Sequence, residues 1–107
     1  MKQIRPAELA AWLADAGRAR PLLLDVREPW EFEKARIAGS RLVPMGEIAR
    51  RVDELDRSSE VVAICHHGGR SMQVALFLEK SGFAAVHNLL GGVDAWSRAV
   101  DPSVPLY

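Results

Sequence analysis

One short segment of the sequence combines a nucleophile, a glycine loop and a cation. Residues 61–71 run V-V-A-I-C-H-H-G-G-R-S, and Cys65 is the only cysteine in the chain. This cysteine ends an apolar run typical of a buried strand, and Arg70 and Ser71 stand where a helix is expected to begin. The loop N–H groups, the positive end of that helix and the arginine would all favour a thiolate. The segment therefore predicts a nucleophilic sulfur.

The four residues between Cys65 and Arg70 are expected to form the wall of this site. Two glycines allow the backbone to turn sharply and to bring its N–H groups close to a ligand. We expect the loop to hold an anionic substrate or the outer sulfur of a persulfide. The predicted substrate-binding residues are His66, His67, Gly68, Gly69 and Arg70.

Two other roles for these residues were weighed. A lone cysteine at the end of a strand is often an inert core residue, but the Gly-Gly-Arg-Ser continuation favours a functional one. His66 and His67 are adjacent in a tight loop, where two side chains rarely converge on one ion, and no C-x-x-C pair is present. We therefore expect no metal and no organic cofactor. Whether either imidazole transfers a proton is left open.

The elements that must position this loop alternate between strands and helices. Short apolar runs predict buried strands, and apolar residues at helical spacing predict helices between them. This alternation predicts an α/β fold with a parallel sheet covered by helices on both faces. Cys65 would then lie at the carboxyl end of a central strand, where such sheets bind ligands. The predicted strands are 22–26, 42–43, 61–65 and 84–89. Helices are predicted after Pro6, from Pro29 to Lys34, over the stripe of Ile48, Val52 and Leu55, and after each of the glycine pairs 68–69 and 91–92.

Other residues receive structural assignments. Asp25 is expected to accept from nearby backbone donors and Arg27 to form an ion pair. Phe77 is expected in the core because it shares a helical stripe with apolar neighbours. The tail, residues 101–107, is expected to lie along the surface.

Composition limits the function. The 107 residues suit one domain, residues 1–107, and 14 basic residues balance 14 acidic ones. No strong charge therefore indicates a nucleic-acid partner, and no apolar stretch is long enough to indicate a membrane partner. The N-terminus lacks the features of a signal peptide, and a single cysteine agrees with a reducing compartment. We expect a cytoplasmic protein.

Several segments together resemble the rhodanese (sulfurtransferase) family. They are the cysteine loop, L-L-L-D-V-R-E-P-W-E-F-E at 22–33, R-I-A-G-S-R-L-V-P-M at 36–45 and N-L-L-G-G-V-D-A-W at 88–96. Their order and spacing are similar to those of single-domain members over nearly the whole chain. Ala35-Arg36-Ile37 departs from the Gly-His-Ile that members often carry, and Gly39-Ser40 from their Gly-Ala. Both departures lie outside the loop.

The resemblance implies a sulfurtransferase of one rhodanese-like domain. Cys65 would take sulfur from a small donor such as thiosulfate, carry it as a persulfide and pass it to a thiol, possibly of a protein, or to cyanide. Two alternatives stay open. One is a phosphatase or arsenate reductase, although these use five residues between cysteine and arginine and this loop has four. The other is a binding module of the same fold without turnover.

Overall fold

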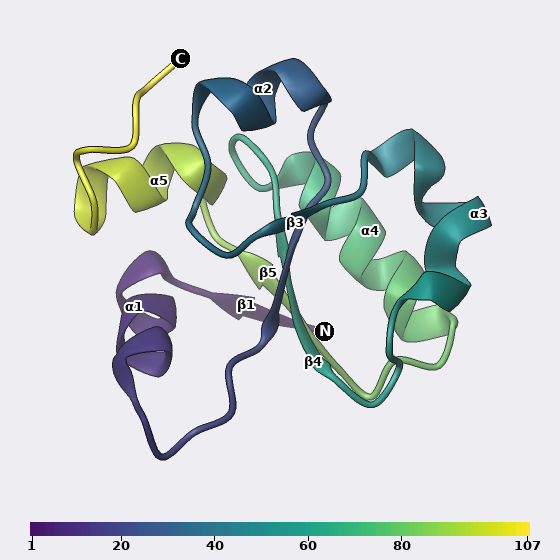
Figure 1. Ribbon diagram of the computed structural model, residues 1–107. Coiled ribbons are helices and arrows are strands. Elements are labelled where there is room, and N and C mark those ends of the chain that lie inside the picture. Colours follow the sequence, from purple (N-terminus) through teal and green to yellow (C-terminus); the bar gives the residue numbers. More distant parts are fainter.

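Five parallel strands form one sheet at the centre of the molecule (Figure 1). The computed structural model describes all residues, 1–107. The strands are β1 (Lys2–Ile4), β2 (Leu22–Asp25), β3 (Arg41–Leu42), β4 (Glu60–Ile64) and β5 (Ala85–Leu89). Their order across the sheet is β1-β5-β4-β2-β3, so β4 is the central strand and Cys65 follows its carboxyl end.

Helices cover both faces of this sheet, as the alternating pattern predicts (Figure 1). Helices α1 (Pro6–Ala14) and α5 (Gly92–Ala99) lie on one face, and α3 (Ile48–Arg51) and α4 (Gly69–Lys80) lie on the other. Helix α2 (Pro29–Lys34) lies over the end of the sheet where the loop after β4 turns into α4. The predicted α/β fold is therefore confirmed.

From Val61 to Ile64, strand β4 is apolar because it is buried on both faces. Val61 and Ala63 pack into the cluster beneath α3 and α4, whereas Val62 and Ile64 pack into the cluster beneath α1 and α5. Side chains alternate between the two faces of a strand, so a strand covered twice needs an apolar residue at every position. These two cores fix the position of the cysteine loop.

Three features differ from the sequence-based expectations. Strand β1 was not predicted, because three residues at a sheet edge carry almost no periodic signal. The stretch from Ile48 to Leu55 is not one helix: α3 lies between two 3-10 turns, η1 (Met45–Glu47) and η2 (Val52–Glu54). Phe77 is 37% exposed and not in the core, because it lines an open pocket between α4 and α3 together with Ile48 and Ala49.

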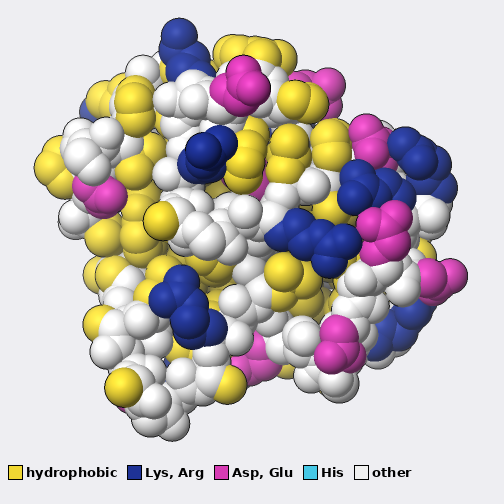
Figure 2. Space-filling view, in the orientation of Figure 1, with side chains coloured by type: hydrophobic (Ala, Val, Ile, Leu, Met, Phe, Trp, Pro, Cys, Tyr) yellow, Lys and Arg dark blue, Asp and Glu magenta, His cyan; other side chains and the backbone are white.

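The surface carries both signs of charge in close mixture (Figure 2). Around α3 and η2, Arg41, Arg50 and Arg51 lie beside Glu47 and Glu54 and form ion pairs with them. This pairing agrees with the overall balance of charge. None of the helices has the length and apolar character that crossing a bilayer requires.

Candidate active site

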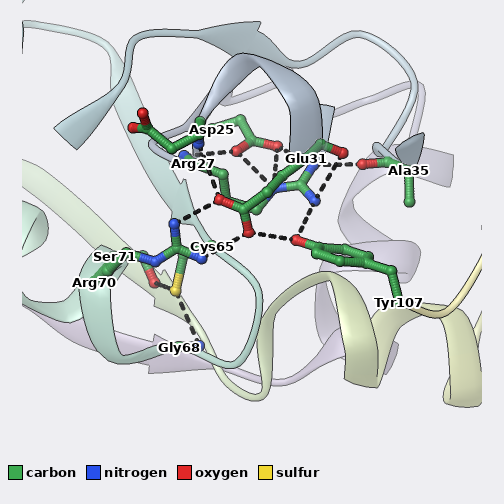
Figure 3. Close-up of polar contacts among 10 residues, drawn as sticks. Asp25, Arg27, Glu31, Ala35, Cys65, Gly68, Arg70, Ser71 and Tyr107 are labelled. Atoms are coloured by element: carbon green, nitrogen blue, oxygen red, sulfur yellow. Dashed lines mark hydrogen bonds and ion pairs between the residues drawn. The ribbon is translucent and has the colours of Figure 1, made fainter. Parts of the chain in front are cut away.

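Cys65 lies directly after β4, and two donors reach its sulfur from the loop and helix that follow (Figure 3). The N–H of Gly68 lies 3.0 Å from Sγ, and the hydroxyl Oγ of Ser71 lies 3.2 Å from it. The sulfur also lies at the start of α4, where backbone N–H groups have no partner within the helix. Both groups are placed to donate hydrogen bonds to the sulfur.

Gly68 makes the turn that aims its N–H at the sulfur. Its φ is +105°, a conformation that side-chain-bearing residues rarely adopt. The carbonyl of Gly68 accepts from Nδ2 of Asn88 at 3.2 Å, so a side chain of β5 also holds this residue. Gly69, the next residue, is exposed and begins α4.

Ser71 and Asn88 are site residues that the sequence analysis missed. Oγ of Ser71 donates to Oδ1 of Asn88 at 2.5 Å, and both residues are almost completely buried. The amide group of Asn88 also donates to Oε1 of Gln3 at 2.8 Å. With its nitrogen engaged in this way, Asn88 must turn its oxygen toward Ser71. A serine at the start of the helix that follows the cysteine loop could have indicated Ser71 as a site residue. Its partner Asn88 lies on β5, and only the tertiary structure brings the two together.

The start of α5 holds the cysteine loop in place. The N–H of Val93 donates to the carbonyl of Cys65 at 2.9 Å, and that of Asp94 donates to the carbonyl of His66 at 3.1 Å. Gly92 makes this approach possible, because a Cβ on it would lie 2.2 Å from the Cys65 carbonyl oxygen. The Gly91-Gly92 pair is the predicted turn into the last helix, and it also positions the loop.

Arg70 is held by a carboxylate from α2. Its two terminal nitrogens lie 2.7 and 2.8 Å from the two oxygens of Glu31, a fork-to-fork ion pair (Figure 3). The side chain of Glu31 is only 5% exposed. Hydrogen bonds from Arg70 are the main reason that the pKa of Glu31 is lowered to about 2, against the effect of burial. Glu31 is a third site residue that the sequence analysis missed.

Tyr107 connects this ion pair to a second one. Its hydroxyl donates to Oε2 of Glu31 at 2.8 Å and accepts from Nη1 of Arg27 at 2.7 Å. Arg27 in turn pairs with Asp25 at 2.8 Å, and both of these side chains are completely buried. The predicted structural roles of Asp25 and Arg27 agree with this geometry. The tail does not merely lie along the surface: Val104 is buried and Tyr107 reaches the site.

Comparison with known proteins identifies the family. A Rhodanese-like domain model matches residues 5–99. The chain belongs to the rhodanese-like family. A sulfurtransferase of Allochromatium vinosum is 35% identical over 98 residues, which cover 92% of this chain and 90% of that protein.

Two further proteins are similar to this chain, one in structure and one in sequence. A rhodanese-related protein of Thermoplasma volcanium has a crystal structure that matches the whole of both chains with a TM-score of 0.85 and 30% identity. The chloroplastic Rhodanese-like/PpiC domain-containing protein 12 of Arabidopsis thaliana is 40% identical over 89 residues. The match covers 79% of this chain but only 30% of that protein. Together, the family match and the sulfurtransferase relative support sulfur transfer as the general chemistry.

The two loop histidines of the rhodanese-like domain stack at the entrance. The ring of His66 lies between those of His67 and Tyr107, with centroids 3.8 and 3.9 Å away. Burial, followed by the charge of His67, lowers the pKa of His66.

The structure also adds a possible third ligand to the histidine pair. Ligand atoms of His66, His67 and Asp94 all lie within 4.8 Å of one another, although the sequence suggested no second ligand set. Stacked rings point their in-plane lone pairs side by side, however, and Asp94 is bound by Arg98 at 3.0 Å. A tetrahedral ion needs converging lone pairs, so this arrangement does not suit one.

Proposed function

We propose that this rhodanese-like domain is a sulfurtransferase that carries sulfane sulfur as a persulfide on Cys65. The observation that carries the proposal is the position of Sγ, 3.0 Å from the Gly68 N–H and 3.2 Å from the Ser71 hydroxyl at the start of α4. The same donors can stabilise the outer sulfur of a persulfide when the loop accommodates it.

The reaction has two steps. The Cys65 thiolate attacks the outer sulfur of a donor such as thiosulfate; the S–S bond of the donor breaks, and sulfite leaves with the bonding electron pair. A thiolate or cyanide then attacks the outer sulfur of the Cys65 persulfide and releases the Cys65 thiolate. The protein therefore alternates between two covalent states. No step needs a metal or an organic cofactor.

The mass of the intact protein tests this proposal. Treatment with thiosulfate or with another sulfane-sulfur donor should add the mass of one sulfur atom, and cyanide should remove it as thiocyanate. Cys65→Ala serves as the control and should gain no cyanide-sensitive mass. An adduct that persists in this variant, or no adduct with any donor, would contradict the proposal.

Hydrolysis of phosphate esters is the alternative that the same residues suggest. Two observations count against it. Only four residues separate Cys65 from Arg70, one fewer than in cysteine phosphatases, and both terminal nitrogens of Arg70 are engaged by Glu31. We expect negligible turnover of an aryl phosphate, and efficient turnover that requires Cys65 would replace the sulfurtransferase proposal.

A further inference from the structure

The charges beside the cysteine loop cancel in pairs. Arg27 is bound by Asp25, and Arg70 is bound by both oxygens of Glu31. The rings of Tyr107 and His66 stack on each other beside these pairs, and burial disfavours the charged form of both. Burial raises the pKa of Tyr107 to about 12, and burial also lowers the pKa of His66. A donor at the mouth of the loop therefore meets no unpaired cation from this group.

Glu31 cannot easily leave Arg70. Its carboxylate also accepts from the N–H of Glu28 at 3.0 Å and from the hydroxyl of Tyr107 at 2.8 Å, and its side chain is almost completely buried. Moving it would strand a buried negative charge and break these hydrogen bonds. The carboxylate thus remains next to Arg70 when a donor arrives.

The fixed negative charge of Glu31 repels a doubly charged donor more strongly than a singly charged one. Arg70 attracts a donor anion, whereas Glu31, whose two oxygens bind the Arg70 guanidinium, repels it (Figure 3). The repulsion grows with each added negative charge on the donor. Thiosulfate carries two negative charges at neutral pH, whereas a thiosulfonate or the persulfide of an uncharged thiol carries one.

We propose that Glu31, positioned by Tyr107, makes the site selective for singly charged sulfane-sulfur donors over doubly charged ones. This inference rests on the proposed persulfide chemistry and names its donor class. With a thiosulfonate, the Cys65 thiolate attacks the outer sulfur, the S–S bond of the donor breaks, and a sulfinate leaves with the electron pair. The products are the Cys65 persulfide and one sulfinate anion, so atoms and charge balance.

The experiment compares thiosulfate with methanethiosulfonate, in which a methyl group replaces one charged oxygen. The rate constant for persulfide formation on Cys65 is measured by intact mass for each donor. Because the two donors differ in intrinsic reactivity, the measured quantity is the ratio of the two rate constants in each variant relative to wild type.

Glu31→Gln removes the charge and keeps the shape. We expect it to shift the ratio toward thiosulfate by about tenfold, equivalent to about 1.4 kcal/mol. Glu54→Gln is the matched control, because Glu54 also binds an arginine, Arg51, but on the exposed surface around η2. It should leave the ratio unchanged.

Tyr107→Phe provides a second variant that keeps the ring on His66 and loses only the hydroxyl. We expect a shift in the same direction by about two- to threefold. Without the Tyr107 hydroxyl, the Glu31 carboxylate is held less firmly next to Arg70 and can turn away from a doubly charged donor. This variant decides the question if Glu31→Gln does not fold.

The failures of the two proposals are distinguishable. A ratio that is unchanged in the folded variants, or that moves toward methanethiosulfonate, would overturn the role of Glu31 while persulfide formation itself still occurs. The absence of a Cys65 persulfide with either donor in wild type would instead overturn the proposed function.

Discussion

At the scale of single residues, the hydroxyl of Ser71 has one proton and two acceptors within reach. When Cys65 is a thiol, Ser71 can donate to Asn88 at 2.5 Å and accept from the S–H group. When Cys65 is a thiolate, the same hydroxyl can turn and donate to the sulfur at 3.2 Å. The single hydroxyl proton can therefore serve only one of these two acceptors at a time.

Ser71→Ala should slow alkylation of Cys65 by iodoacetamide at pH 7 by about tenfold. A hydrogen bond to a charged group contributes roughly 1.5 kcal/mol or more, and the variant lacks the one that Ser71 can donate to the sulfur. Ser97→Ala is the matched control, because Ser97 is also buried but donates to the carbonyl of Val104, away from the sulfur. Equal alkylation rates in wild type and Ser71→Ala would show that the hydroxyl does not stabilise the thiolate.

At the scale of elements, the cysteine loop depends on α5 as much as on the strand and helix that flank it in sequence. The first N–H groups of α5 bind the carbonyls of Cys65 and His66. These contacts occupy the carbonyl side of the loop peptides. They also explain why Gly92 must lack a side chain: its φ is +60°, and a Cβ would overlap the loop backbone.

Gly92→Ala should lower the free energy of unfolding by about 3 kcal/mol or more, because backbone on both sides must shift and the positive φ adds strain. Sulfur transfer by the molecules that remain folded should fall as well. Gly46→Ala in η1 is the control, since its Cβ would meet no atom within 4 Å. Urea unfolding and a persulfide-formation assay on both variants would check this, and a Gly92→Ala protein as stable and active as Gly46→Ala would contradict it.

At the scale of the whole molecule, the Glu31–Arg70 pair joins α2 to α4, and Tyr107 joins both to the tail. Because the folded-state pKa of Glu31 lies near 2, below its ordinary value of 4.5, the ionised carboxylate stabilises the fold. This contribution is fully present above about pH 4.5 and is lost as the pH falls through 4.5 toward 2.

Wild type should therefore exceed Glu31→Gln in free energy of unfolding by at most about 3 kcal/mol at pH 7. The difference should shrink between about pH 4.5 and 2, because protonation then removes the same charge in wild type. Urea titrations of the two proteins at several pH values measure the difference directly. A difference that stays constant down to pH 2 would mean that the charge of Glu31 does not stabilise the fold.

The local features of this site were determined by the sequence itself. The run from Val61 to Ser71 contains a strand, a turn and a helix start in consecutive residues, and Asp25 and Arg27 are two residues apart. Short-range patterns of this kind depend on backbone preference, on continuous apolar runs and on the alternation of strand and helix segments, which are visible without any long-range contact. The parallel sheet with helices on both faces followed from the same alternation.

Tertiary structure decided which distant side chains complete the site. Glu31 is 39 residues from Arg70, Tyr107 is 76 residues from Glu31, and Asn88 is 17 residues from Ser71. Nothing in the local sequence around any of these residues specifies its partner, because the pairing depends on how α2, β5 and the tail pack against the two cores. The sequence therefore predicted the loop that carries Cys65, whereas the packed fold determined how the charge of Arg70 is balanced.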